Sequence, residues 1–394
     1  MPDHEYMLRG LLEHIAKEQN YKDANIKVEP ISSGGANYTS VLFNTTILAP
    51  NRKDLKLFAK VANLCEKSRT LVPSSIFDTE RFVYRDLAEV FKVIERKCNI
   101  PETERYVFPK FYGYNPNIYE ETIVLENLAA QGYVVYDRLK SVDWPYASKA
   151  VETLARFHAL AMAYEDKNPE EYHKLLEKLN KQIEPAYDTM SGNFQNFVKT
   201  ALSATRKENK ERLQKYFDRE LSLKGNIFNR YTKVNRRPVI IHGDYRPSNI
   251  MHRVNKDGSV DLIPLDYQTI QAGCGIADLL YFIFSGSDSQ FRARHYTRLV
   301  DHYYDSLSKA LLKLQLDPQK VYPREDFDYE LQEALPFGLI CAVFLLPVIT
   351  VESEDAPDIN ADDVWSSIAN TKTSRHYPER LNGVVDDYIK WAIL

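Results

Sequence analysis

The sequence predicts an α+β protein of two lobes, a small β-rich N-terminal lobe and a larger, mostly α-helical C-terminal lobe. Three observations support this prediction. The chain has 394 residues, more than one compact core usually holds. Patterns typical of β-strands concentrate before residue 127, and helical periodicity dominates after residue 146. We expect an N-terminal lobe of residues 1–127 and a C-terminal lobe of residues 128–394, with the boundary in the segment 127–136.

The N-terminal part alternates helical and strand patterns. An amphipathic stretch over residues 6–17 predicts an opening helix. Residues that favour β-structure predict strands over 26–31, 39–48, 55–61, 107–114 and 122–126, the first three of them antiparallel. Between the third and fourth strands, apolar residues at helical spacing predict a helix over 75–97.

The C-terminal part is predicted to be mainly helical. Helical periodicity is clear over residues 150–164, continues through the charged run 170–219, and returns from residue 276 onward. Between these helices an apolar run that predicts a strand ends at Asp244, and a polar turn at 255–259 predicts a hairpin. Residues 339–349 are the most apolar stretch, but they are too short to cross a membrane and contain a proline, so we expect a buried core helix. An acidic loop is expected over 352–363.

Composition excludes several classes of function. A net charge of −4 gives no reason to expect a nucleic-acid partner or an anionic membrane surface. The four cysteines, at positions 65, 98, 274 and 341, form no C-x-x-C pair, which argues against a zinc site and a disulfide framework. The N-terminus resembles no signal peptide, and no membrane span is apparent. We therefore expect a cytoplasmic protein.

The most informative stretch is Val239-Ile-Ile-His-Gly-Asp-Tyr-Arg-Pro-Ser-Asn-Ile-Met251, followed by Leu262-Ile-Pro-Leu-Asp-Tyr-Gln268. Asp244 and Asp266 each follow an apolar strand, and Asn249 lies five residues after Asp244, so three oxygen-bearing side chains are expected at one loop edge. This spacing suits phosphoryl transfer, in which Mg²⁺ prefers oxygen ligands and a carboxylate receives the proton of the attacking hydroxyl. Asn249 and Asp266 are the candidate metal ligands and Asp244 the candidate base. The alternative is an ordinary Asp- and Asn-rich turn.

His242, two residues before the candidate base, is expected to brace the loop by hydrogen bonding rather than to take part in the chemistry.

Two upstream features are consistent with a nucleotide site. Gly34, Gly35 and Asn37 lie in a turn between two strands, where glycine lets backbone N–H groups approach phosphate oxygens, although a plain hairpin has the same pattern. Lys60 lies in an apolar strand, where an unpaired ammonium is costly. Glu80 on the next helix is its expected partner, and an exposed edge-strand lysine is the alternative.

The strand at 122–126 ends where the lobes are expected to meet. The backbone of residues 126–128 could therefore hydrogen-bond an adenine edge there. A strand end without a ligand is the alternative, and side-chain identity does not decide between them.

Several ordered motifs resemble the ecdysteroid-kinase-like family, within the choline kinase and aminoglycoside phosphotransferase group. They are Gly35-Ala-Asn-Tyr-Thr-Ser40, Leu57-Phe-Ala-Lys60, Phe77-x-x-Glu80-x-x-x-Tyr84, Val124-Leu-Glu-Asn-Leu128, Leu154-Ala-Arg-Phe-His158, His242-Gly-Asp244-x-x-x-x-Asn249 and Leu265-Asp-Tyr-Gln268. The resemblance covers about residues 30 to 350. It implies a protein-kinase-like bilobal fold, ATP with Mg²⁺ as cofactors, and phosphorylation of a hydroxyl group on a small molecule. We also expect a monomer.

The resemblance implies a role for each matching residue. By this resemblance Gly35, Ala36, Asn37, Tyr38 and Lys60 contact the phosphates, and Glu80 holds the lysine in place. Glu126 and Leu128 supply the hinge contacts to the nucleotide. Asp244 is the base, and Asn249 and Asp266 bind the metal. Asp278 is expected to anchor the catalytic loop, and Tyr267-Gln268 in place of the Phe-Gly of protein kinases speaks against a protein substrate.

One departure bears on the substrate. Many family members carry a tryptophan soon after the catalytic aspartate, whereas this chain has Tyr245-Arg246-Pro247, and an arginine there could bind an anion or brace the loop. The first expectation is an ecdysteroid or a similar apolar polyhydroxylated alcohol, C-22 phosphorylation of an ecdysteroid being the best-known reaction in the group. The alternatives are a choline- or aminoglycoside-type phosphotransferase and a non-catalytic, ligand-binding pseudokinase.

Overall fold

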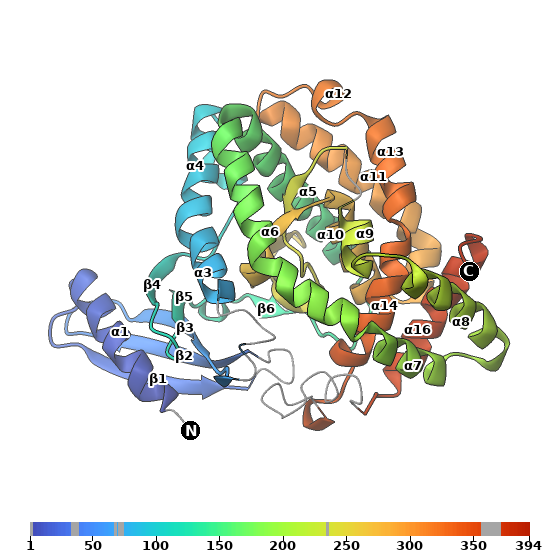
Figure 1. The fold of residues 1–394 in the computed structure, drawn as a ribbon. Coiled ribbons are helices and arrows are strands. Elements are labelled where there is room, and N and C mark those ends of the chain that lie inside the picture. Colours follow the sequence, from blue (N-terminus) through green and yellow to red (C-terminus); the bar gives the residue numbers. More distant parts are fainter. Residues whose placement is uncertain (1–2, 33–38, 67–68, 70–74, 234–235, 356–371) are drawn as a thin grey trace.

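The structure is a computed structural model that describes all residues except 1–2, 33–38, 67–68, 70–74, 234–235 and 356–371. It has the predicted α+β architecture of two lobes (Figure 1). An antiparallel sheet with one helix against it forms one end of the molecule, and helices form most of the rest.

The N-terminal sheet has five strands in the order β1-β2-β3-β5-β4. These strands are β1 (Asn25–Ile31), β2 (Ser40–Leu48), β3 (Leu55–Ala62), β4 (Phe111–Asn115) and β5 (Thr122–Glu126), and helix α1 (His4–Glu18) packs on the sheet. All neighbouring pairs are antiparallel, as predicted for the first three. The fourth strand begins at residue 111 rather than the predicted 107. Residues 107–110 belong to no strand, and a single backbone hydrogen bond, from the N–H of Glu126 to the oxygen of Lys110 at 2.9 Å, joins this segment to β5.

The predicted helix over 75–97 is present with one irregular turn. It consists of α3 (Ser75–Phe82), a π-helical turn η1 (Val83–Leu87) and α4 (Ala88–Lys97). Its buried side chains, such as Phe77, Tyr84 and Phe91, belong to the large apolar core of the helical lobe. That core also includes sheet residues such as Ile123, whereas other sheet residues form a separate small core with α1. The helix that carries Glu80 is therefore fixed mainly to the helical lobe, as its position in Figure 1 also shows.

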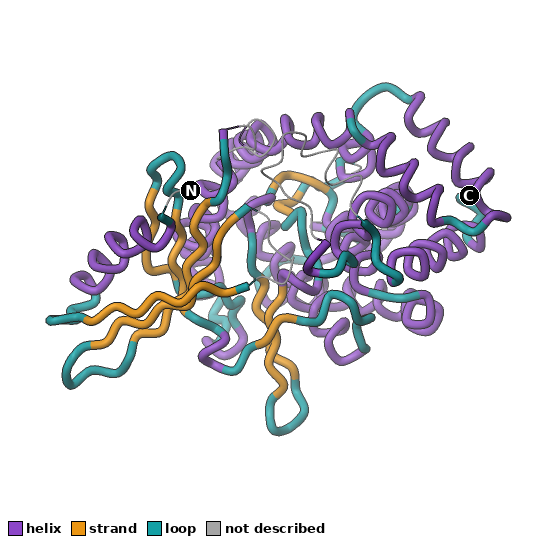
Figure 2. The backbone as a smooth tube through the Cα atoms, turned by 90° about the horizontal axis from the view of Figure 1, so that it is seen from below, coloured by secondary structure: helices purple, strands orange, loops and turns teal. Residues whose placement is uncertain are grey.

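The helical lobe contains long helices around a few short strands. The helices are α5 (Trp144–Lys167), α6 (Pro169–Gly192), α7 (Phe194–Ala204), α8 (Lys207–Ser222), α9 (Ile227–Thr232), α10 (Gly275–Gly286), α11 (Ser289–Lys313), α12 (Pro318–Val321), α13 (Arg324–Ala334), α14 (Pro336–Ile349) and α16 (His376–Lys390). The strands are β6 (Val134–Val135), β7 (Val239–Ile241), β8 (Ile250–Val254), β9 (Val260–Pro264) and β10 (Gln271–Gly273). Figure 2 shows the N-terminal sheet to one side of the main body of helices. The predicted hairpin is β8–β9, whereas β6 and β10 were not predicted because strands of two or three residues have no readable period.

Helix α14 is the buried core helix that the sequence predicts, with nearly all of its side chains inside the lobe. Within the described residues, no single helix combines the length and apolar character that a membrane crossing requires. Helices α13 and α14, bent by 48° at their junction, meet that requirement only as a pair and only by length and composition.

Candidate active site

A buried aspartate anchors the loop that follows strand β7. Asp278, in the first turn of α10, accepts hydrogen bonds from the backbone N–H groups of His242 (2.6 Å) and Gly243 (2.9 Å). His158 of α5 lies 3.1 Å from the same carboxylate through its Nε2 atom. Because two backbone donors converge on one side chain, the loop leaves the strand at a fixed angle. The anchoring expected for Asp278 is therefore present.

Gly243 permits the sharp turn of this loop. Its φ of +80° lies in the left-handed region, and a Cβ atom there would lie 2.4 Å from the backbone oxygen of Thr269. We predict that Gly243→Ala lowers the free energy of unfolding by at least about 2 kcal/mol, measured by urea denaturation. The matched control is Gly258→Ala, since Gly258 has a φ of +83° with no atom within 4 Å of the added Cβ. Equal losses for the two variants would contradict the steric explanation.

His242 braces the loop, as expected from the sequence. Its Nε2 atom lies 2.9 Å from the backbone oxygen of Leu265, and its Nδ1 atom accepts a hydrogen bond from the backbone N–H of Asp244 at 3.3 Å. The ring is buried. Since both ring nitrogens are engaged within the protein, His242 ties the loop after β7 to the end of β9.

The carboxylate of Asp244 accepts hydrogen bonds from three side chains. Arg246 donates through Nε to both oxygens, at 3.0 and 3.2 Å. Tyr281 of α10 donates its hydroxyl to Oδ1 at 2.7 Å, and Asn249 donates its amide to Oδ2 at 2.8 Å. These contacts hold the carboxylate in one orientation. The Asp244–Asn249 proximity expected from the five-residue spacing is thus present.

The β8–β9 hairpin brings Asp266 to the same site. The backbone N–H of Leu265 donates to the backbone oxygen of Asn249 at 2.8 Å, so the two candidate metal ligands lie at the base of one hairpin. Asp266 itself has a φ of +64°, a conformation that aspartate tolerates better than most residues. The hydroxyl of Tyr84 accepts a hydrogen bond from the backbone N–H of Asp266 at 3.1 Å and so supports that conformation.

Lys60 joins the two lobes at this point. Its ammonium lies 2.9 Å from Glu80 Oε2 on α3, 2.5 Å from Asp266 Oδ1 and 3.2 Å from Gln268 Oε1. The Lys60–Glu80 pair is the one predicted. The contact with Asp266 was not expected, and it connects the central strand of the sheet directly to the catalytic loop region. Tyr84 donates to the other oxygen of Glu80 at 3.3 Å.

The burial of this cluster shifts the proton affinities of its members. Burial would lower the pKa of Lys60, but the carboxylates of Asp266 and Glu80 outweigh it and raise the pKa. Burial raises the pKa of Glu80 more than the lysine lowers it. For Asp266, burial would also raise the pKa, yet Lys60 lowers it below its ordinary value. Lys60 and Asp266 therefore form a charged pair at neutral pH.

A comparison with known families decides the classification. Residues 34–316 match the ecdysteroid kinase-like family, which is well over half of the chain. The chain belongs to the ecdysteroid kinase-like family. This result confirms the resemblance seen in the sequence motifs.

Solved structures that resemble this ecdysteroid kinase-like chain are distant. An aminoglycoside-3′-phosphotransferase of type VIII matches with a TM-score of 0.38 and 15% identity, covering 86% of this chain and 99% of that chain. A microcompartment-associated aminopropanol kinase matches with a TM-score of 0.46 and 10% identity, over 97% and 98% of the two chains. A macrolide 2′-phosphotransferase from Brachybacterium faecium has a TM-score of 0.36 and 12% identity, over 84% and 90%. A search of curated proteins gave no match.

The donor set at Asn249 and Asp266 suits a hard cation such as Mg²⁺. An amide and a carboxylate supply oxygen ligands, which Mg²⁺ prefers, and Mg²⁺ usually takes only one or two protein ligands beside waters and substrate phosphates. In the part of the chain that the structure describes, no group of three or more His, Cys, Asp or Glu side chains could hold a metal ion.

The remaining nucleotide contacts predicted from sequence are only partly described. Gly35, Ala36, Asn37 and Tyr38 lie outside the described residues, so the phosphate loop stays a prediction.

Glu126 ends strand β5, where the sequence predicts that strand to end. The backbone oxygen of Leu128 accepts hydrogen bonds from Gln131 and Tyr133, so it is already used within the protein. The side chain of Leu128 packs with Tyr133 and Ile263 in a small apolar cluster beside the β8–β9 hairpin. Such a cluster suits the face of a flat ring, but the hinge contacts themselves stay predictions.

Sequence reasoning missed three residues of this ecdysteroid kinase-like site. Nothing in the spacing of Tyr281 indicates its bond to Asp244. Gln268 was noted only as a departure from protein kinases, yet it contacts Lys60. Tyr84 was part of a motif, and its position four residues after Glu80 on a helix is the signal that places the two side chains together.

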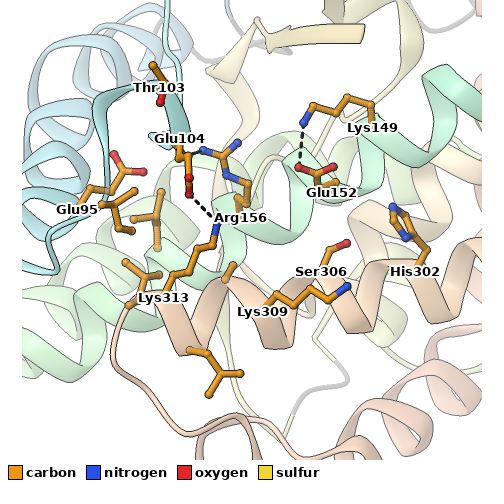
Figure 3. Close-up of a pocket in the computed structure, with 15 residues that line it drawn as sticks. Glu95, Thr103, Glu104, Lys149, Glu152, Arg156, His302, Ser306, Lys309 and Lys313 are labelled. Atoms are coloured by element: carbon orange, nitrogen blue, oxygen red, sulfur yellow. Dashed lines mark hydrogen bonds and ion pairs between the residues drawn. The ribbon is translucent and has the colours of Figure 1, made fainter. Parts of the chain in front are cut away.

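A surface cavity of about 540 Å³ lies elsewhere, between α4, α5, α11 and the segment 100–104 (Figure 3). It shares no residue with the site around Asp244. Two ion pairs lie among its lining residues, Lys313 with Glu104 at 2.6 Å and Lys149 with Glu152 at 2.9 Å. The cavity is therefore not part of the candidate active site.

Proposed function

We propose that this protein is an ATP-dependent kinase that transfers the γ-phosphoryl group, with Mg²⁺, to a hydroxyl of a small-molecule alcohol. The observation that carries the proposal is the cluster of Lys60, Glu80 and Asp266 beside the hydrogen-bonded pair Asp244–Asn249. Phosphoryl transfer needs cations for the phosphates, oxygen ligands for a metal and an oriented proton acceptor. The cluster has the residue types for all three.

Each residue has a distinct task in the proposed reaction. Lys60, held by Glu80, binds phosphate oxygens of the nucleotide. Asn249 and Asp266 would hold Mg²⁺, which supplies charge stabilisation for the phosphates when it is bound. Asp244 orients the acceptor hydroxyl and accepts its proton.

Lys60 and Asp266 contact each other in this structure, so a bound nucleotide and metal would share the two side chains that now pair directly. The proposed reaction therefore requires each of them to exchange part of this contact for a ligand.

For the acceptor we propose an ecdysteroid or a similar apolar polyhydroxylated alcohol. Family membership supports this choice. A choline- or aminoglycoside-type alcohol remains the alternative substrate, and a non-catalytic ligand-binding protein the alternative function. The presence of Lys60, Glu80, Asp244, Asn249 and Asp266 together favours catalysis over a non-catalytic role, because a decayed site would not need to keep all five.

We further propose a cytoplasmic monomer.

A coupled ADP-release assay would test the proposal. The purified protein, with ATP and Mg²⁺, is given ecdysteroids, other sterols, choline-like amines and aminoglycosides, and products are identified by mass. We expect ADP release with a polyhydroxylated steroid and a product heavier by one phosphoryl group. Release with a cationic alcohol alone would select the alternative substrate class. Nucleotide binding without turnover on any alcohol would favour the non-catalytic alternative.

A further inference from the structure

Arg246 is a buried cation that has been described so far only as a hydrogen-bond donor that orients Asp244. Only 8% of the residue is exposed. Its Nε atom donates to both oxygens of Asp244, and its Nη1 atom donates to the Ser248 hydroxyl at 2.6 Å. Burying a guanidinium is costly unless it is paired and hydrogen-bonded. Arginine at this position therefore calls for an explanation.

The local sequence fixes where the guanidinium lies. Pro247 disfavours helical backbone at the residue before it, and Arg246 accordingly has extended dihedrals, φ −127° and ψ 156°. Pro247 itself is confined by Gly286, where an added Cβ atom would lie 2.6 Å from the proline ring. The start of this loop is thus rigid, and it directs the arginine back toward the carboxylate two residues earlier.

The charge of Arg246 pairs directly with Asp244 and interacts electrostatically with Asp266. Burial would lower the pKa of Arg246, but the carboxylate of Asp244, the Tyr281 side chain and the carboxylate of Asp266 act in the opposite sense and raise it. In turn Arg246 helps to lower the pKa of Asp266, after the larger effects of burial and Lys60. The guanidinium therefore lies within electrostatic reach of the proton acceptor on one side and the nucleotide-side carboxylate on the other.

We propose that Arg246 is a catalytic residue that binds oxygens of the phosphoryl group in transfer. This inference rests on the proposed function. The acceptor oxygen forms its bond to the γ-phosphorus next to Asp244, the bond to the β–γ bridging oxygen breaks on the nucleotide side next to Lys60, and the hydroxyl proton passes to Asp244. Arg246 gains and loses no proton.

The charge balance explains why a cation is needed on the Asp244 side. On the nucleotide side, Lys60 supplies positive charge, but the carboxylates of Glu80 and Asp266 already share it. Asp244 would otherwise repel the phosphoryl oxygens as they approach the alcohol. A fixed guanidinium stabilises negative charge there without needing to reorganise, which is the most effective form of electrostatic catalysis.

The competing explanation is that Arg246 only braces the loop. A brace would affect every nucleotide alike, whereas a contact with the transferred phosphoryl distinguishes ATP from ADP. The test is therefore isothermal titration of wild type and Arg246→Gln with Mg²⁺ and either the β,γ-imido analogue of ATP or ADP, together with measurement of kcat and KM on the best alcohol substrate.

We expect Arg246→Gln to bind the ATP analogue about 10-fold more weakly than wild type, to bind ADP within about 2-fold of wild type, and to lower kcat by at least about 100-fold. Arg246→Lys, which keeps the charge but not the planar fork, should recover part of the loss. Equal weakening of both nucleotides, or no weakening of either, would overturn the inference. Failure of wild type to bind any nucleotide would instead overturn the proposed function itself, so the two failures are distinguishable.

Arg230→Gln is the matched control. Arg230 forms a part-buried ion pair with Glu220 at 2.9 Å in the helical lobe, outside the site. Its replacement should change stability but leave the ratio of the two nucleotide affinities as in wild type. A changed ratio in this control would show that loss of a buried arginine, rather than a phosphoryl contact, causes the effect, and would overturn the inference.

Discussion

Asp244→Asn is expected to lower kcat by about 1,000-fold, within the range that general acid–base groups contribute, while the affinity for Mg²⁺ and ATP changes little. The amide cannot accept the proton of the alcohol. The N–H group of the asparagine amide would also point at hydrogen-bond donors, because Arg246, Tyr281 and Asn249 all donate to the carboxylate in the wild-type protein. The Tyr281 hydroxyl can turn to accept a hydrogen bond, but the arginine cannot, so the lost contact adds to the chemical loss.

Steady-state turnover and nucleotide titration check this expectation. The matched control is Asp261→Asn, which removes another aspartate bonded to an arginine, since Asp261 lies 2.7 Å from Arg253 on the β8–β9 hairpin. This control should turn over within about 2-fold of wild type, because exposed ion pairs contribute little. Turnover of Asp244→Asn at the wild-type rate would show that another group accepts the proton.

Lys60→Met is expected to have the second large effect, on both stability and nucleotide binding. Removing one partner of a buried ion pair typically costs about 3–5 kcal/mol, and here two carboxylates, of Glu80 and Asp266, would lose their cation. Charge-assisted hydrogen bonds contribute about 1.5–3 kcal/mol each, so the affinity for ATP should fall by about 10- to 150-fold. Urea denaturation and nucleotide titration measure the two effects.

Two further variants separate these effects. Lys60→Arg keeps the positive charge, so it should retain much of the stability while still weakening ATP binding, because a planar guanidinium does not replace a compact ammonium among three acceptors. Lys56→Met, at an exposed position near the start of the same strand, should change neither property appreciably. If Lys60→Met were as stable as wild type and bound ATP normally, Lys60 would have neither role.

Much of the fold followed from the sequence because the relevant signals are local. The strands of the N-terminal sheet, the helix over 75–97 and the hairpin after Asn249 each have a period or a turn that can be read within a few residues. The π-helical turn η1 has no such signal. The division of the apolar cores has no local signal either. The helix that carries Glu80 packs with the helical lobe, and this packing depends on residues that are far apart in the chain.

The site residues also divide into contacts that local sequence predicts and contacts that only the packing of distant segments brings about. Spacing alone indicated that Asp244 and Asn249 lie together, and an apolar strand around Lys60 indicated that its ammonium needs a partner. The contact between Lys60 and Asp266 joins residues 206 positions apart, and no local pattern encodes it. The bond from Tyr281 to Asp244 likewise depends on how α10 packs beneath the loop.

By itself the sequence determined the residue types of the site and the family of the chain, since side-chain chemistry and short-range spacing are written directly in it. Only the tertiary structure decided which charges meet: that Lys60 is shared by Glu80 and Asp266, and that Arg246 faces Asp244. The physical reason is that a buried charge needs a partner close by, because burial of an unpaired charge is costly. The packing of distant segments brings these partners close, so their positions follow from the whole fold rather than from any one stretch of sequence.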